Sequence, residues 1–193
     1  MDQAEELRNV IKKQNQRTKK PARIITVTSG KGGVGKSNIA VNLAVQFQRM
    51  GLKTIIFDAD IGLANVEVMF GTIPQYSLND LIYHDKEIED IITDGPEGVG
   101  FISGGSGIMG LSNLTLDQIS YLVKSVEKLS VIADIVIVDT GAGISDSVME
   151  FVASSPEILL VTTPEPSSLT DAYSLLKLSL IHISEPTRPR LIS

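Results

Sequence analysis

The chain has 193 residues, of which 42% are hydrophobic and 21% charged, and its formal net charge is −6. This length and balance fit one folded domain and exclude a largely disordered chain, while the negative charge disfavours a protein that coats nucleic acid. The absence of cysteine excludes a disulfide scaffold, a thiolate zinc site, a cysteine nucleophile and a cysteine-held iron–sulfur cluster in this chain.

The first 22 residues differ in charge from the rest of the chain. Residues 1–20 carry a net charge of +3, so the remainder carries −9. Ala4, Leu7 and Ile11 recur at helical spacing, which predicts an amphipathic helix over residues 2–16, followed by a linker that ends at Pro21. A disordered leader is the alternative. The charge contrast indicates an arm, residues 1–22, whose function is separate from that of the body.

The body, residues 23–177, alternates short apolar runs with segments of helical periodicity. Strands are expected within segments 23–29, 53–60, 101–110, 134–143 and 157–166. Helices are expected over residues 37–50, 116–129 and 145–154. Nearly apolar strands that alternate with helices predict an α/β fold, in which helices cover both faces of a mainly parallel sheet.

The last sixteen residues, 178–193, do not continue this alternation. The run LSLIHISEPTR, Leu178 to Arg188, resembles the in-frame translation of a transposase-end sequencing adapter. We therefore expect a non-native tail and a natural sequence that ends near Lys177. A genuine irregular tail is the alternative, and a continuous natural reading frame at the source locus would establish it.

The run GKGGVGKS matches the phosphate-binding pattern G-x-x-x-x-G-K-[ST], with a strand expected before it and a helix after it. Glycines allow successive backbone N–H groups to point at a phosphate, and the start of the helix adds a positive dipole. The Lys36 ammonium can reach the β- and γ-phosphates, and the Ser37 hydroxyl can ligate Mg²⁺. The predicted nucleotide-binding residues are Gly30, Lys31, Gly32, Gly33, Val34, Gly35, Lys36, Ser37 and Asn38.

Carboxylates follow two of the expected strands. Asp58 and Asp60 end the run KTIIFDAD, and Asp139 follows the run IVIV. The carboxyl ends of parallel strands face the crevice where ligands bind. We expect Asp139 to bind Mg²⁺ through water, and Asp58, which shares a strand face with Asp60, to support the Mg²⁺ water shell. A helix cap is the alternative for an aspartate after an apolar strand.

Lys31, directly after the first glycine, gives the deviant form of the loop, KGGVGKS. With this loop and DADIGLANVEVMFG, the chain resembles the MinD/ParA family of P-loop ATPases over residues 2–177. The resemblance implies a three-layer P-loop NTPase fold of the SIMIBI type and Mg²⁺-dependent hydrolysis of ATP to ADP and phosphate, slow unless two chains dimerise on ATP. It implies catalytic roles for Lys31, Lys36 and Asp60: Lys31 would reach the partner's nucleotide and Asp60 would hold the attacking water. Asn65 would lie near the dimeric nucleotide site.

Within the family, the arm is similar to that of FlhG-type flagellar regulators (also termed YlxH or FleN). The run DQAEELR matches the D-Q-A-x-x-L-R motif that precedes the ATPase domain in that branch. The resemblance implies that Asp2, Gln3, Leu7 and Arg8 activate an FlhF-type signal-recognition GTPase, with Gln3 entering its active site. The alternatives are a MinD-like division-site ATPase, a ParA-type partition ATPase, an arm that lies on a membrane, and an inert ATPase whose arm alone acts.

The resemblance also bears on location and completeness. The family continues with further strands and a C-terminal amphipathic helix that binds membrane, so we expect a C-terminally truncated domain here. No apolar run reaches the roughly 18–20 residues of a membrane span, and MDQAEELRNV lacks the apolar centre of a signal peptide. We expect a cytoplasmic protein, peripheral to the inner face of the cell membrane when ATP-bound through that missing helix. No specific nucleic-acid partner is expected, because the body is acidic.

Overall fold

A mainly parallel sheet organises the computed structural model, which describes residues 21–105 and 114–184. Six strands in these ranges lie in the order β3-β4-β2-β5-β1-β6, and the edge strand β3 runs antiparallel to β4. The strands are β1 (Arg23–Ser29), β2 (Thr54–Ala59), β3 (Thr93–Asp94), β4 (Gly100–Ile102), β5 (Ile135–Ala142) and β6 (Glu157–Leu160). The expected mainly parallel α/β sheet is confirmed. The arm helix predicted over residues 2–16 lies outside the described residues.

Three helices match predicted ones to within one residue at each end: α2 (Lys36–Arg49), α5 (Leu116–Leu129) and α6 (Asp146–Ser154). Five further helical elements lie in segments for which the sequence predicts no helix. They are α3 (Asn65–Phe70), α4 (Leu78–Tyr83), the 3₁₀ turns η1 (Ile88–Ile91) and η2 (Pro96–Gly98), and α7 (Pro166–Ser184). Four of the five span at most six residues, too few to display a helical period in the sequence.

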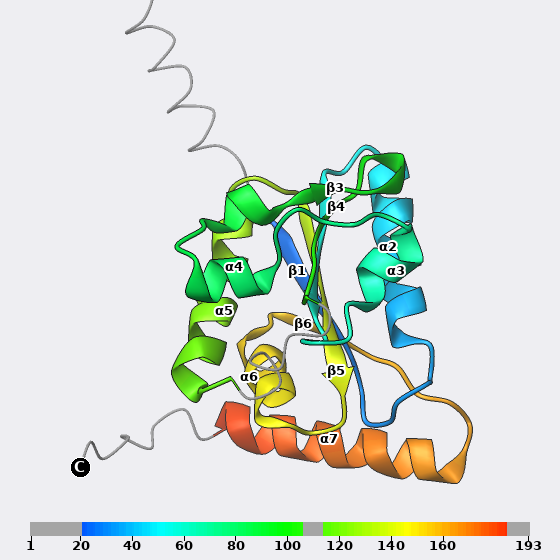
Figure 1. Cartoon of the computed structure of the whole chain (residues 1–193). Coiled ribbons are helices and arrows are strands. Elements are labelled where there is room, and N and C mark those ends of the chain that lie inside the picture. Colours follow the sequence, from blue (N-terminus) through cyan, green and yellow to red (C-terminus); the bar gives the residue numbers. More distant parts are fainter. Residues whose placement is uncertain (1–20, 106–113, 185–193) are drawn as a thin grey trace, which may run out of the picture.

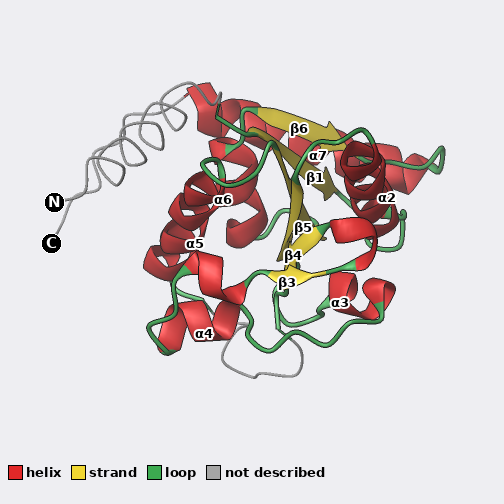
Figure 2. Cartoon of the chain, turned by 90° about the horizontal axis from the view of Figure 1, so that it is seen from above, coloured by secondary structure: helices red, strands yellow, loops and turns green. Residues whose placement is uncertain are grey.

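The sheet separates two apolar cores, as the alternation along β2 illustrates. Ile55 and Phe57 face a core shared with α4, α5 and α6, whereas Ile56 faces a core shared with α2 and α3. Successive strand side chains point to opposite faces, so an apolar strand can fill both cores. Figure 2 shows α5 and α6 on one side of the strands and α2 and α3 on the other. This arrangement is the predicted three-layer fold.

Helix α7 crosses the molecule next to α6, along the lower side of Figure 1. Leu175 of α7 packs against Val148 and Val152 of α6. The helix continues to Ser184 and so passes the expected boundary near Lys177, which the backbone does not mark. The adapter origin of residues 178–193 stays a prediction. None of the helices in residues 21–105 and 114–184 is both long and apolar enough to cross a membrane.

The strand register brings three motifs that are distant in sequence to one edge of the sheet. Strand β5 lies between β1 and β2, with Asp139 opposite Val27 of β1 and opposite Asp58 of β2. The glycine-rich loop follows β1, and the two aspartate motifs lie toward the ends of β2 and β5. The glycine-rich loop and the three aspartates therefore lie at one edge of the sheet, at the carboxyl ends of the central strands.

Candidate functional site

A cavity of about 980 Å³ opens at this edge. Four segments line it: the glycine-rich loop with the start of α2, the end of β2 with α3, the start of α5, and the end of β5 with the start of α6. The predicted residues on its wall are Gly32, Gly33, Val34, Gly35, Lys36, Ser37, Asn38, Asp60 and Asn65. Four predicted residues are not on the wall, namely Gly30, Lys31, Asp58 and Asp139.

The glycine-rich loop leaves the start of α2 open to an anion. Gly33 and Gly35 have φ values of +78° and +89°, and Gly35 is the N-cap of α2. Side chains rarely adopt this left-handed conformation, which explains glycine at both positions. No side chain caps α2 and no acidic residue stands in its first turn. Since the first N–H groups of a helix lack partners within the helix, they can bind a phosphate.

Gly30 and Lys31 face α7 instead of the cavity. A Cβ atom on Gly30 would lie 2.5 Å from the Asp171 carbonyl oxygen, so only glycine fits between the loop and the helix. The Lys31 ammonium donates to Glu165 Oε2 at 2.8 Å and to Ser167 Oγ at 3.1 Å. This contact raises the pKa of Lys31 and lowers that of Glu165. The single chain therefore holds Lys31 away from its own phosphate site.

A buried ion pair joins Lys36, on the cavity wall, to Asp139 behind it. Lys36 Nζ lies 3.2 Å from Asp139 Oδ1, and the Asp139 side chain is fully buried. Asp139 Oδ2 has no hydrogen-bond partner among the described residues. A buried polar atom without a partner is costly, at about 1–3 kcal/mol, so this oxygen fits a site that a ligand or its water completes.

The residues around Asp139 fit Mg²⁺ bound together with a nucleotide. Ser37 lines the cavity and would supply a hydroxyl ligand. Asp139 lies behind the wall, and its Oδ2, unpartnered among the described residues, would hold a metal-bound water. No group of three or more acidic or histidine side chains within residues 21–105 and 114–184 could hold a metal by itself. Mg²⁺ commonly binds through one or two protein groups, several waters and substrate phosphates, which is the arrangement that these residues allow.

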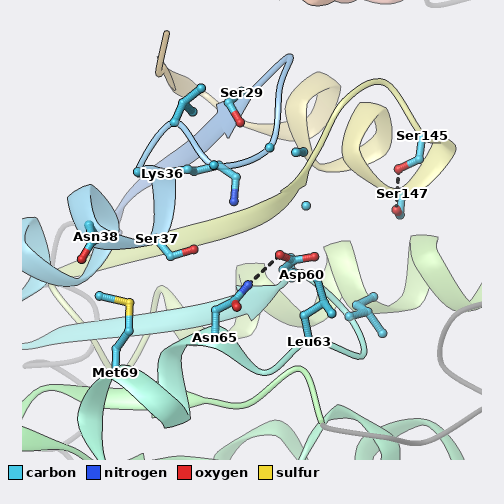
Figure 3. A pocket seen from close by; sticks show the side chains of 18 of the residues that line it. Ser29, Lys36, Ser37, Asn38, Asp60, Leu63, Asn65, Met69, Ser145 and Ser147 are labelled. Carbon is cyan, nitrogen blue, oxygen red and sulfur yellow. Dashed lines mark hydrogen bonds between the residues drawn. The ribbon is translucent and has the colours of Figure 1, made fainter. Parts of the chain in front are cut away.

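Asp60 points into the cavity from the segment after β2. Its Oδ2 accepts a hydrogen bond from Asn65 Nδ2 at 2.7 Å, and Lys36 points toward the same space (Figure 3). A Cβ atom on Gly141 would lie 3.2 Å from Asp60 Oδ1, so glycine leaves room for this carboxylate. Burial raises the pKa of Asp60, and the nearby Lys36 opposes that shift. The carboxylate is thus oriented on two sides and aimed at the predicted phosphate position.

Asp58, for which we expect a role in the Mg²⁺ water shell, lies behind the cavity wall. Its side chain is fully buried and does not line the cavity. Its Oδ1 accepts the Asp60 N–H at 3.1 Å, and its Oδ2 accepts the Val66 N–H at 3.1 Å. Burial raises the pKa of Asp58 to about 7, although the Val66 N–H opposes the shift. Both oxygens are thus engaged by the backbone of the segment that carries Asp60.

Comparison with known protein families identifies the family of this chain. The ParA model, described as the NUBPL iron-transfer P-loop NTPase, matches residues 20–180. This chain belongs to the ParA family of P-loop NTPases. Among curated ParA-family relatives, it is 44% identical to the antiactivator FleN of Pseudomonas aeruginosa over 158 residues, covering 82% of this chain and 56% of FleN. It is 37% identical to the flagellum site-determining protein YlxH of Helicobacter pylori over 183 residues, covering 92% of this chain and 62% of YlxH.

Solved ParA-family structures share the fold. The septum site-determining protein MinD of Pyrococcus horikoshii, complexed with Mg-ADP, superposes with a TM-score of 0.74 at 30% identity. The match covers 81% of this chain and 64% of that one. The cell division ATPase MinD of Pyrococcus furiosus gives a TM-score of 0.75 at 29% identity, covering 84% of this chain and 68% of that one. The predicted MinD/ParA resemblance is confirmed.

Several wall residues of this ParA-family site were missed from the sequence. Ser145, Asp146 and Ser147 line the cavity at the start of α6, where Ser145 is the N-cap. Ser145 Oγ and Ser147 Oγ lie 3.1 Å apart (Figure 3). Serine followed by aspartate, one residue after the run DTGAG, is a helix-start signal that could have indicated them. His84, predicted to be a surface residue, is exposed at the end of α4.

Proposed function

We propose that the chain is the nucleotide-binding part of an FlhG-type flagellar regulator, an ATP-dependent dimerisation switch that controls flagellar number and placement. The observation that carries the proposal is a cavity lined by the open start of α2, by Lys36 and by Asp60, with Asp139 paired to Lys36 behind its wall. The relative named a flagellum site-determining protein, YlxH, supports the flagellar branch, and the relative FleN is named an antiactivator.

The proposed reaction is the hydrolysis of ATP to ADP and phosphate. Phosphoryl transfer to water depends mainly on positioning and on neutralising charge. Lys36 would neutralise the β- and γ-phosphates from the start of α2, and Asp60 would orient the attacking water. Bound Mg²⁺, held by Ser37 and by water on Asp139, would supply further positive charge.

Dimerisation would complete the site in this proposal. Lys31 lies outside its own cavity and its ammonium contacts Glu165 and Ser167 at the start of α7. A second chain facing the cavity could place its own Lys31 beside the nucleotide. ATP turnover would therefore be slow in a single chain and faster when two chains associate.

The arm would supply a partner function. Residues 1–20 lie outside the described residues, so this part of the proposal is supported by the DQAEELR motif. Asp2, Gln3, Leu7 and Arg8 would engage an FlhF-type signal-recognition GTPase, and Gln3 would help to orient its water. The whole protein would be cytoplasmic and would reach the inner face of the cell membrane when ATP-bound.

The decisive test measures GTP hydrolysis by a purified FlhF-type GTPase with this chain added. Stimulation that is lost with Gln3→Ala supports the flagellar branch and a role for Gln3 in trans. Equal rates with wild type, with Gln3→Ala and without the chain would contradict it and favour the MinD-like alternative. A peptide of residues 1–20 is the matched reagent, because it separates the effect of the arm from that of the ATPase body.

A further inference from the structure

The segment between β2 and α3 has a backbone that needs support. Ala64 is fully buried and has φ 47° and ψ 46°, and Gly62 has φ 95°. The left-handed conformation costs a residue with a side chain about 1–2 kcal/mol, so it persists where surrounding contacts impose it. This segment, residues 60–66, carries both Asp60 and Asn65, whose side chains line the cavity.

Asp58 connects the two ends of this segment. Its Oδ1 accepts the N–H of Asp60, the first residue, and its Oδ2 accepts the N–H of Val66, the last. The position of Asp58 is itself fixed, because its backbone pairs with that of Asp139 in the β2–β5 ladder.

A second element packs on the backbone around the same segment. A Cβ atom on Gly104, just after β4, would lie 2.9 Å from the Asp58 carbonyl oxygen and 3.3 Å from that of Asp60. The neighbouring Ser103 donates to Glu67 Oε2 of α3 at 2.7 Å. The segment therefore packs closely against Gly104, in addition to its hydrogen bonds with the Asp58 carboxylate.

We propose that Asp58 is a positioning residue that closes the segment 60–66 and thereby aims Asp60 and Asn65 at the phosphate position. This inference rests on the proposed function in so far as Asp60 acts in hydrolysis. It differs from a role for Asp58 in the Mg²⁺ water shell, because each of its carboxylate oxygens is engaged by a backbone N–H of the segment itself.

The test uses Asp58→Asn in the full chain. The amide has the same shape but only one acceptor oxygen, so one of the two bonds to the segment is lost. We expect kcat for ATP hydrolysis to fall by about 10- to 100-fold, as for a small misplacement of reacting groups. The Kd for ADP and the Mg²⁺ concentration at half-maximal rate should stay within about twofold, because the groups that bind them are not displaced. Ser103→Ala, which removes a bond to α3 without touching Asp60, is the matched control and should retain kcat.

Hydrogen exchange in the wild-type chain gives a readout that needs neither turnover nor a folded variant. In the wild-type chain, the Asp60 and Val66 amides should exchange as slowly as those of β2, and in Asp58→Asn they should exchange faster. Fast exchange of both amides in the wild type would overturn the proposal. So would a fall in kcat that is matched by a proportional rise in the Mg²⁺ requirement, since that result assigns Asp58 to the metal. A wild-type chain that binds no nucleotide would refute the proposed function, while exchange would still test Asp58.

Discussion

The contact between Gly30 and α7 gives the most direct test of the structure. In Gly30→Ala, the added methyl group would lie 2.5 Å from the Asp171 carbonyl oxygen and 2.7 Å from the Ala172 amide nitrogen. Both atoms belong to the backbone of α7, so no side chain can rotate away to make room. The helix or the loop must move by about 1 Å to restore ordinary contact distances, which are near 3.5 Å.

Overpacking of this kind costs about 1–3 kcal/mol, and a backbone obstacle places Gly30→Ala near the upper end, at about 3 kcal/mol. For a chain of this size the expected fall in Tm is about 6–12 °C. Gly32→Ala is the matched control, since its nearest neighbour is the Ala142 Cβ at 4.0 Å and its φ is not left-handed. That variant should change the free energy of unfolding by less than about 0.5 kcal/mol.

Thermal and urea unfolding of the two variants and the wild type measure the difference without nucleotide. A lower midpoint for Gly30→Ala than for Gly32→Ala supports the close approach of the glycine-rich loop to α7. Equal midpoints would refute the reasoning, because they would mean that α7 yields to the methyl group at no cost.

Three further predictions concern charged groups in the cavity or behind its wall. Lys36→Ala should abolish ATP binding in calorimetric titration and lower the free energy of unfolding by about 3–5 kcal/mol, because Asp139 is left buried without its partner; retained ATP affinity would contradict the phosphate assignment. Asp60→Asn should keep nucleotide binding and slow phosphate release by about a hundredfold, and a normal rate would exclude a role in orienting water. Burial raises the pKa of Asp58 to about 7, so the folded chain binds a proton on the Asp58 carboxylate more tightly than the unfolded chain does. The stability that results is lost as the pH rises through 7. Between pH 5 and pH 8 the stability of the wild type relative to Asp58→Asn should therefore fall by about 2–3 kcal/mol in urea unfolding, at 1.36 kcal/mol per pKa unit; a constant difference would contradict the shift.

Much of the fold could be predicted because its signals are local. The runs RIITVTS and DIVIVDTGAG are apolar enough to fill both cores, and α5 begins and ends at the predicted residues. The spacing of glycines and Lys36 predicts a phosphate loop because the loop is built from consecutive backbone groups. The short α3 and α4 and the antiparallel β3 were missed, since elements of two to six residues display no period.

Asp58 and Asp60 illustrate where the alternation of side chains along a strand fails to predict their positions. Alternation along a strand places residues two apart on the same face, which predicted that Asp58 shares the face of Asp60 and supports the Mg²⁺ water shell. Strand β2 ends at Ala59, however, so Asp60 leaves the strand and enters the cavity while Asp58 stays inside the sheet. Similarly, the loop pattern predicts Lys31 as part of the nucleotide site, whereas the ion pair with Glu165 arises from a residue 134 positions away.

The sequence by itself determined the longer strands, the helices α2, α5 and α6, the phosphate loop and the family, because these depend on neighbouring residues and their spacing. The tertiary structure alone decided that Asp139 pairs with Lys36, that Asp58 holds the segment carrying Asp60, and that α7 packs on Gly30. The physical reason is the strand order. Placing β5 between β1 and β2 sets three distant motifs side by side, and the contacts between them exist only after the sheet has formed.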